Sequence, residues 1–254
     1  MVSDVTIRYA THDRQVTAVE NVSFQVAGGE KFVLLGPSGC GKSTLLKSVA
    51  GFVPTAAGSI ALHGRVVDRP GPDRVVVFQE FDQLLPWKTV LGNVVYALKV
   101  TRRVPGDQVE PHALRFVRMV GLEPFKDAYP HTLSGGMKQR VAIARSLALG
   151  PEMLLMDEPF ASLDALTRTR MQGELNTIWR ETRKTILFVT HSIQEAIILG
   201  NRILVMTPGP GRVRTILDNE AAAQPLDSPA FVKMQRVVHD LLEADGADGA
   251  RRHA

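Results

Sequence analysis

The sequence predicts an α/β protein with a mainly parallel core sheet, and two patterns carry this prediction. Short apolar runs have the length and composition of buried strands, and segments with helical spacing separate the later runs. Strands that alternate with helices are typical of a parallel sheet. The predicted core strands are residues 32–35, 75–78, 153–156, 185–189 and 202–206, and helices are predicted at 166–181 and 192–199.

The N-terminal part shows a different pattern, which predicts an antiparallel β subdomain. Residues 5–9 alternate between apolar and polar side chains, as a half-buried strand does. Residues 18–26 are expected to form the hairpin partner, across a polar turn near residues 12–14. A further short strand is expected at 60–62, after the first helix.

A helical insertion of roughly 60 residues is expected between the strands that end near Phe78 and begin at Met153. This helical subdomain spans about 86–150, and its last helix is expected at 134–149. The apolar residues at helical spacing are Val94, Ala97, Leu98, Ala113, Phe116, Val117 and Val120.

After a turn at 208–211, a last strand is expected at 213–217 and a last helix at about 229–243. Ser228 and Pro229 have the residue types that favour the N-cap and first turn of that helix. Residues 245–254 are expected to be a disordered tail. The chain is therefore predicted to be one domain over residues 1–244.

Composition and charge exclude several classes of protein. Of the 254 residues, 44% are hydrophobic, and the formal charge of +4 is spread along the chain rather than gathered in a basic stripe. Nucleic-acid binding is therefore not expected. No apolar run approaches the length of a membrane span, and no signal pattern opens the chain, so a cytoplasmic protein is expected.

The stretch from Gly36 to Thr44 matches G-x-x-x-x-G-K-[ST], the phosphate-binding P-loop. It lies between an apolar run and a predicted helix, which is the context that the motif requires. Backbone N–H groups and the positive end of the helix favour anions there. Lys42 is expected to bind the β- and γ-phosphates and Ser43 to ligate Mg²⁺. The expected nucleotide-binding residues of the loop are Gly36, Ser38, Gly39, Cys40, Gly41, Lys42, Ser43 and Thr44.

Cys40 is the one cysteine of the chain, so no internal disulfide can form. A helix N-terminus and Lys42 would favour its thiolate, which makes a reactive thiol one interpretation. The favoured interpretation is that Cys40 only occupies a spacer position of the P-loop.

An apolar run ends in two acids, Asp157 and Glu158. In a P-loop protein the first acid supports the Mg²⁺ shell. Glu158 is placed to accept a proton from an attacking water, which makes it the candidate general base. In isolation the same pair would be interpreted as a solvated turn at the end of a strand.

A second phosphate-facing loop is predicted at residues 133–140, where Ser134, Gly135 and Gly136 open a helix. A serine hydroxyl and free N–H groups at a helix start are the parts of an anion site, although a plain N-cap would look the same. One nucleotide does not need two such surfaces from one subunit. The simplest resolution is a dimer in which each copy's Ser134 loop closes the other copy's P-loop.

The order and spacing of these motifs resemble the ATP-binding-cassette (ABC) ATPases over about residues 5–206. That resemblance implies a head-to-tail nucleotide-sandwich homodimer that uses ATP and Mg²⁺ and drives membrane subunits. The motifs that carry it are Gly36–Thr44, Gln79, Leu133–Arg140, Asp157-Glu158, Ala161-Ser162-Leu163-Asp164 and His191.

The resemblance also implies a role for single residues. Gln79 would contact Mg²⁺ or the attacking water, and His191 would hold the γ-phosphate. Asp164 would link the two sites across the dimer, and Tyr9 would stack on adenine. Ser134, Gly135 and Gly136 would contact the γ-phosphate of the partner's nucleotide. Met137 departs from the glutamine that many members have after the two glycines, and no loss of activity is expected from it.

Residues 77–90 and the sequence around Asp157, Asp164 and His191 resemble the nitrate/sulfonate/taurine branch of bacterial importers. This implies a subunit at the cytoplasmic face of the cell membrane, bound to a permease that receives cargo from an extracytoplasmic binding protein. The segment with Leu84, Leu85 and Trp87 is either a packed turn or a docking surface.

Two other functions remain as alternatives. One is an ATPase of an export or lipoprotein-extraction complex, which the segment around Trp87 argues against. The other is a soluble ABC ATPase of translation or DNA repair, which is disfavoured because the chain has a single uninterrupted cassette and no basic stripe. The sequence does not identify the transported substrate.

Overall fold

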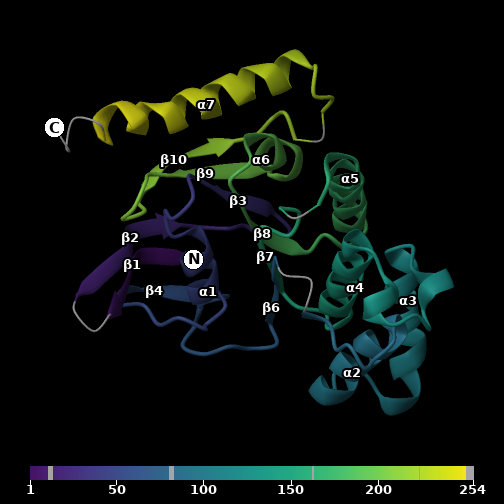
Figure 1. Ribbon diagram of the computed structural model, residues 1–254. Coiled ribbons are helices and arrows are strands. Elements are labelled where there is room, and N and C mark those ends of the chain that lie inside the picture. Colours follow the sequence, from purple (N-terminus) through teal and green to yellow (C-terminus); the bar gives the residue numbers. More distant parts are fainter. Residues whose placement is uncertain (11–13, 80–82, 162, 223, 250–254) are drawn as a thin grey trace. The chain divides into compact units, whose positions relative to one another are not determined.

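A computed structural model describes residues 1–10, 14–79, 83–161, 163–222 and 224–249 (Figure 1). Contacts between Cα atoms divide the chain into two compact units. Unit 1 consists of Met1–Gly71 and Thr185–Ala254, and unit 2 of Pro72–Lys184. Each unit has its own buried core and is described separately.

Unit 1 contains the predicted antiparallel sheet near the N-terminus, with the strand order β2-β1-β4-β5. β1 pairs with both β2 and β4, and its buried Val5 and Ile7 face the interior. The predicted pairing of the two hairpin strands is confirmed, whereas the turn predicted near residues 12–14 falls largely outside the described residues. The two-residue β5 was not predicted. The strands are β1 (Val2–Ala10), β2 (Gln15–Phe24), β4 (Ala57–Leu62) and β5 (Arg65–Val66).

The second sheet of unit 1 carries the mainly parallel strands. β3 is parallel to β8 on one side and β9 on the other, and β10 runs antiparallel to β9. All five residues of β3 are buried, as its run of apolar side chains predicts. The strands are β3 (Lys31–Leu35), β8 (Thr185–Thr190), β9 (Arg202–Met206) and β10 (Val213–Asp218).

The α-helices in the described part of unit 1 are α1 (Lys42–Val49), α6 (Ile193–Leu199) and α7 (Pro229–Gly249). In Figure 1, α6 and α7 lie on one side of these strands and α1 on the other. The Ser228 hydroxyl accepts a hydrogen bond from Phe231 N at 3.2 Å, which confirms the predicted start of α7.

The last helix is longer than expected. It continues to Gly249, so the residues from 245 to 249 that were expected to be tail are helical. This stretch contains Gly246 and Gly249, which are poor helix formers, so its helical conformation goes against the local sequence preference. The remaining residues, 250–254, lie outside the described part of the chain.

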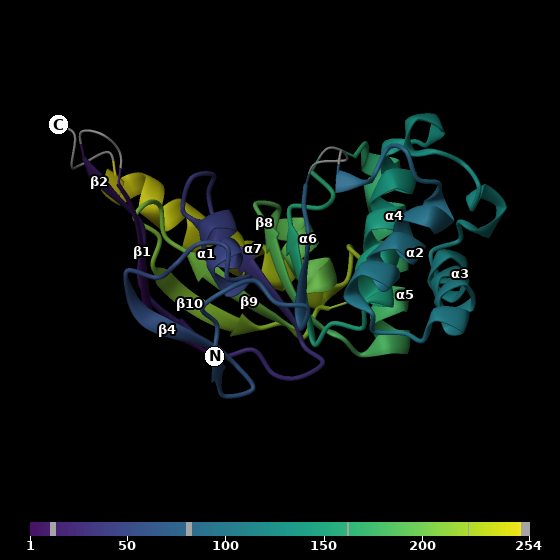
Figure 2. The same ribbon diagram turned by 90° about the horizontal axis from the view of Figure 1, so that it is seen from below.

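The described residues of unit 2 form a parallel strand pair and four α-helices. β6 pairs in parallel with β7, with Val77 opposite Met156. Figure 2 shows the helices gathered together, in agreement with the predicted helical insertion. The elements are β6 (Arg74–Val77), β7 (Met153–Asp157), α2 (Val90–Thr101), α3 (Val109–Met119), α4 (Gly135–Ala148) and α5 (Ala165–Thr182).

The described helices were compared with the length and hydropathy that crossing a bilayer requires. None of them is long and apolar enough to do so.

Candidate nucleotide site

The P-loop connects β3 to α1 in unit 1. Gly41 is the N-cap of α1 with a φ of 93°, a left-handed conformation that glycine adopts without strain. Among the described residues no side chain caps this helix. Since the first N–H groups of an α-helix have no partner within the helix, this end can donate to an anion.

The Lys42 side chain is buried within its own loop. Its ammonium donates hydrogen bonds to the carbonyl oxygens of Gly36 at 2.8 Å and Pro37 at 2.9 Å. Only 4% of the residue is exposed. The ammonium is therefore held inside the loop. A short movement of the side chain can exchange its carbonyl acceptors for phosphate oxygens.

Cys40 is fully buried in the same loop, with its Sγ 3.8 Å from the Lys42 ammonium. Burial raises the pKa of the Cys40 thiol, and the attraction of the Lys42 ammonium offsets this only in part. A raised pKa and a buried sulfur disfavour the reactive-thiol interpretation. The geometry supports the interpretation of Cys40 as a spacer of the P-loop.

Tyr9, the predicted adenine-stacking residue, lies near the end of β1. Its hydroxyl donates to Thr44 Oγ1 at 3.3 Å, which ties the strand to the first turn of α1. The residue is 40% exposed, so the protein covers this side chain only in part.

His191 follows β8 directly and is exposed. In the parallel pairing of β3 with β8, Leu35 lies opposite Thr190, so Gly36 and His191 leave the sheet at the same edge. Thr190 Oγ1 donates to Glu195 Oε2 at 2.6 Å and accepts from Ser192 N at 3.0 Å. These buried bonds fix the turn that carries His191 beside the P-loop.

Thr190 and Glu195 were not predicted to support the site. In the sequence the two residues are only five positions apart, which does not indicate a contact. A hydrogen bond between the end of a strand and the next helix produces no periodic pattern. The Ser192 hydroxyl, which accepts from Glu195 N at 3.3 Å, is an N-cap that the residue type does favour.

Unit 2 brings together three other predicted residues. Because β6 and β7 are parallel, Gln79 and Glu158 follow the two strands at one edge, beside Asp157 at the end of β7. Asp157 is buried, Glu158 is partly exposed and Gln79 is exposed. Glu158 has a φ of 44°, a strained value for a residue other than glycine, and such values cluster at functional sites.

The predicted second anion loop is the N-terminus of α4. Ser134 is the N-cap, and its hydroxyl accepts a hydrogen bond from Met137 N at 3.3 Å. Gly135 and Gly136 are the first two residues of the helix. A Cβ on Gly136 would lie 2.9 Å from Thr167 Cγ2, so this glycine allows the close approach of α4 and α5.

Asp164 is the N-cap of α5 and accepts a hydrogen bond from Thr167 N at 3.0 Å. This backbone bond lowers the pKa of the Asp164 carboxyl, so the side chain is ionised at neutral pH.

Arg168 donates to the carbonyl oxygens of Phe160 at 3.3 Å and Leu163 at 2.9 Å. It thereby fixes the turn before α5, a role that sequence pattern alone did not suggest. Ser162 lies outside the described residues.

The segment with Leu84, Leu85 and Trp87 is packed on one side and exposed on the other. Leu84 is buried, whereas Trp87 is 68% exposed. Asn93, fully buried on α2, accepts from Leu85 N at 2.8 Å and donates to the carbonyl oxygens of Lys88 and Thr89. The turn is therefore packed against Asn93 of α2 on one side, and Trp87 points away from this packed side. Residues 80–82 lie outside the described part of the chain.

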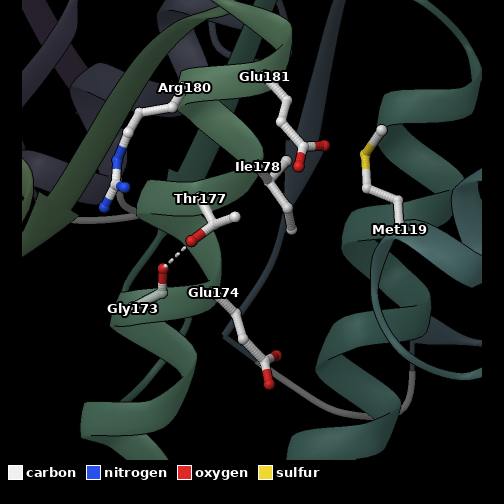
Figure 3. Close-up of a pocket in the computed structure, with 7 residues that line it drawn as sticks. All are labelled: Met119, Gly173, Glu174, Thr177, Ile178, Arg180 and Glu181. Carbon is white, nitrogen blue, oxygen red and sulfur yellow. Dashed lines mark hydrogen bonds between the residues drawn. The ribbon is translucent and has the colours of Figure 1, made fainter.

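A pocket of about 420 Å³ lies between α3 and α5 in unit 2 (Figure 3). Its apolar side chains are Met119 and Ile178, and the carboxyl groups of Glu174 and Glu181 stand on the same side of α5. None of the predicted site residues lines it. The pocket is therefore not part of the candidate nucleotide site.

No group of three or more His, Cys, Asp or Glu side chains that could hold a metal ion occurs in the described ranges. A site that binds Mg²⁺ together with ATP does not need one, because this ion is usually held by one or two carboxylates and by phosphate oxygens. The buried carboxylate of Asp157 and the Ser43 hydroxyl at the start of α1 are donors of the type that Mg²⁺ accepts.

Comparisons with known proteins identify the family. The ABC transporter family model matches residues 19–161. A taurine import ATP-binding protein of Rhizobium johnstonii is 47% identical over 247 residues, which cover 92% of this chain and 92% of the relative. An uncharacterized ABC transporter ATP-binding protein of Methanocaldococcus jannaschii is 48% identical over 85% of this chain and 80% of its own. The export alternative has no support among these relatives.

Solved structures agree with the fold. A dimeric ATP-binding cassette in a post-hydrolysis state with ADP and Pi has a TM-score of 0.74 and 32% identity, over 86% of this chain and 98% of its own. The cbiO1 subunit from Clostridium perfringens, part of an ABC transporter complex, has a TM-score of 0.77 and 27% identity, over 94% and 97% of the two chains. The P-loop geometry, the family match and these likenesses together show that the chain belongs to the ABC transporter family and carries its ATP-binding cassette.

Proposed function

We propose that this chain is the ATP-hydrolysing subunit of a bacterial ABC importer that takes up a small anion such as nitrate, a sulfonate or taurine. The observation that carries the ATPase part is the P-loop, whose buried Lys42 ammonium lies among backbone carbonyls at the uncapped start of α1. The importer part is supported by relatives named for taurine import, at 46–48% identity over most of the chain.

In the proposed reaction the P-loop binds the phosphates, with Lys42 on the β- and γ-phosphates and Tyr9 against the adenine. Mg²⁺ bound with ATP neutralises phosphate charge, and Ser43, Gln79 and Asp157 are the side chains that would hold it. The remaining protein groups act on the attacking water and the γ-phosphate.

Glu158 accepts a proton from the attacking water, a role that typically contributes about 10²–10⁴-fold in rate. The strained backbone of Glu158 and its place after a buried strand support this assignment. His191 donates to the γ-phosphate from the turn fixed by Thr190.

Two copies form a head-to-tail homodimer in which Ser134, Gly135 and Gly136 of one copy contact the nucleotide of the other. Asp164 communicates between the two sites. Ionised Asp164 and the capped start of α4 supply a fixed charge and oriented donors for these contacts. The dimer binds a membrane permease at the cytoplasmic face of the cell membrane, and an extracytoplasmic binding protein delivers the cargo to that permease.

Light scattering with Mg-ATP tests the proposal on the parent chain and on Glu158→Gln. Removing the base should stop turnover while ATP still binds, so the variant should accumulate as a dimer. Glu110→Gln on the exposed face of α3 is the matched control and should behave as the parent. Turnover by Glu158→Gln at the parent rate would refute the base role.

A growth assay tests the cargo class. A strain that lacks this chain should lose growth on one of taurine, another sulfonate or nitrate as the only source of sulfur or nitrogen. The parent chain should restore growth and Lys42→Ala should not. Unchanged growth on all of these anions would contradict the importer assignment.

A further inference from the structure

The loop between β9 and β10, residues 207–212, contacts the strand β2 in unit 1. Gly211 N donates to Ala18 O at 3.0 Å, and Glu20 N donates to Gly211 O at 2.9 Å. This pair of bonds forms an isolated parallel bridge between Gly211 and Val19. The loop is therefore joined to the backbone of β2 at one residue, Gly211.

Gly211 also lies directly against the P-loop. A Cβ at this position would be 1.9 Å from Cys40 O and 2.7 Å from Met206 Cε. The φ of Gly211 is not left-handed, so its backbone conformation does not require glycine. The absence of a side chain at Gly211 serves the close approach of two backbone segments.

The P-loop makes a second contact of this kind through Gly41. A Cβ on Gly41 would be 2.7 Å from both Ala18 O and Val19 Cγ2. The Cys40–Gly41 peptide thus packs against Gly211 and against β2, and these two segments are hydrogen-bonded to each other. The peptide just before α1 has little freedom to tilt.

Polar contacts hold the 207–212 loop in place. Arg212 donates to Glu20 Oε2 from Nη2 at 2.6 Å and from Nε at 3.1 Å. Arg212 N also donates to Thr207 Oγ1 at 3.1 Å, and Thr207 N donates to Arg212 O at 3.0 Å. The loop is closed on itself and is fixed to β2 beside Gly211.

We propose that Gly211 is a positioning residue for nucleotide binding, which acts by setting the orientation of the Cys40–Gly41 peptide at the start of α1. This inference rests on the proposed nucleotide site. The N–H groups around this peptide bind phosphate only if they point into the loop. Hydrogen bonds weaken steeply when donor and acceptor are misaligned, so a side chain at residue 211 that tilts this peptide weakens nucleotide binding without touching the nucleotide.

The test compares Gly211→Ala with Gly28→Ala in the full chain. Gly28 is the matched control because nothing lies within 4 Å of a Cβ built there and its φ is not left-handed. Equilibrium binding of Mg-ATP and the thermal unfolding midpoint without nucleotide are measured for both. We expect Gly211→Ala to bind Mg-ATP at least tenfold more weakly, and its midpoint to fall, because a Cβ at 1.9 Å from Cys40 O must displace backbone. Gly28→Ala should match the parent in both measurements.

Lys42→Ala is measured in parallel. It distinguishes a wrong positioning role for Gly211 from a wrong nucleotide site. If Lys42→Ala loses binding while Gly211→Ala binds as the parent does, the positioning role is wrong and the site stands. If Lys42→Ala also binds normally, the proposed site itself fails. A fall in the unfolding midpoint of Gly211→Ala with unchanged affinity of the folded protein would show a purely structural role and overturn the inference.

A charge reversal keeps the inference testable if Gly211→Ala does not fold. Arg212→Glu and Glu20→Arg each break the ion pair that holds the loop, and the double variant restores it with the charges exchanged. Because the pair is partly exposed, each single change should weaken Mg-ATP binding by about two- to fivefold. The double variant should recover the parent affinity. Unchanged affinity in both single variants, or no recovery in the double variant, overturns the inference.

Discussion

At the scale of single residues, the P-loop places the Cys40 thiol and the Lys42 ammonium next to each other, yet burial affects the two groups differently. The Lys42 ammonium has oxygen acceptors from Gly36 and Pro37, which compensate the burial of its charge. The Cys40 sulfur is buried with no comparable stabilisation of a thiolate, and burial raises the pKa of its thiol. A protonated, inaccessible thiol reacts slowly with electrophiles because the thiolate is the nucleophile.

The chain has one cysteine, so alkylation measures Cys40 without ambiguity. We expect the native protein to react with iodoacetamide at neutral pH at least tenfold more slowly than the protein unfolded in guanidinium chloride. The rate of carboxamidomethylation is followed by mass spectrometry, with the unfolded chain as the control. A native rate equal to the unfolded rate would support the reactive-thiol interpretation instead.

Local motifs indicated the candidate nucleotide-binding residues more readily than the residues that hold these candidates in place. Lys42 and Ser134 lie in patterns whose chemistry is specific, so their place at helix starts was predictable. Gly211 gives no such signal, because its role depends on the carbonyl oxygen of Cys40, far away in the sequence. Contacts between distant backbone segments have no periodicity that a single sequence could reveal.

At the scale of elements, the turn before α2 depends on one buried side chain. Asn93 makes four hydrogen bonds to backbone atoms of Leu85, Lys88 and Thr89. These bonds satisfy polar groups that the apolar surroundings would otherwise leave without partners. They also hold the exposed Trp87 in a fixed turn.

Asn93→Leu should therefore destabilise the chain. It removes the donors and the acceptor while leaving the backbone groups buried, a change that typically costs about 1–3 kcal/mol. The guanidinium midpoint and slope give the loss in free energy of unfolding. Trp87→Ala is the control, since this exposed residue should change that free energy by no more than about 0.5 kcal/mol. An Asn93→Leu variant as stable as the parent would contradict this account.

The start of α4 offers a second prediction, because Gly136 and Thr167 leave no room for another methyl group. Gly136→Ala forces its Cβ against Thr167 Cγ2, at 2.9 Å before any relaxation. Thr167→Ser removes that methyl group and keeps the hydroxyl. In a double-mutant cycle on the free energy of unfolding, we expect the pair to show favourable coupling of about 0.5–3 kcal/mol. Additive effects would mean that this contact does not explain the glycine.

Periodicity predicted the elements better than it predicted their ends and pairings. β9 begins and ends as expected because its four consecutive apolar positions are bounded by the polar residues Arg202 and Thr207. α7 runs past its expected end although Gly246 and Gly249 are weak helix formers, so residue propensity alone did not predict where this helix ends. The pairing of β4 and β5 with the N-terminal hairpin could not be predicted, because partner choice between short strands depends on tertiary packing.

At the scale of the whole molecule, the predicted site residues are distributed over the two units. Tyr9, the P-loop and His191 belong to unit 1, whereas Gln79, Glu158 and Ser134 belong to unit 2. In the proposed homodimer a two-fold axis would make the two nucleotide sites identical, each with the P-loop of one copy and the Ser134 loop of the other. Every site would then need both copies.

This sharing predicts that two inactive variants restore activity when they are mixed. Lys42→Ala removes the phosphate-binding ammonium, and Ser134→Arg blocks the second anion loop, so each homodimer has two defective sites. A mixed dimer has one site with both defects and one site with neither. Random mixing in equal amounts makes half of the dimers mixed, so about a quarter of the parent ATPase rate should return if the sites act independently.

The measurement is steady-state ATP hydrolysis by each variant alone and by their equimolar mixture at the same total concentration. The matched control mixes Lys42→Ala with a second P-loop variant, Ser43→Ala. In this mixture each copy carries a defective P-loop. That control should stay inactive, because every composite site then contains a defective P-loop. A mixture of Lys42→Ala and Ser134→Arg that stays as inactive as its components would contradict the shared site, since a site built within one copy gains nothing from a partner.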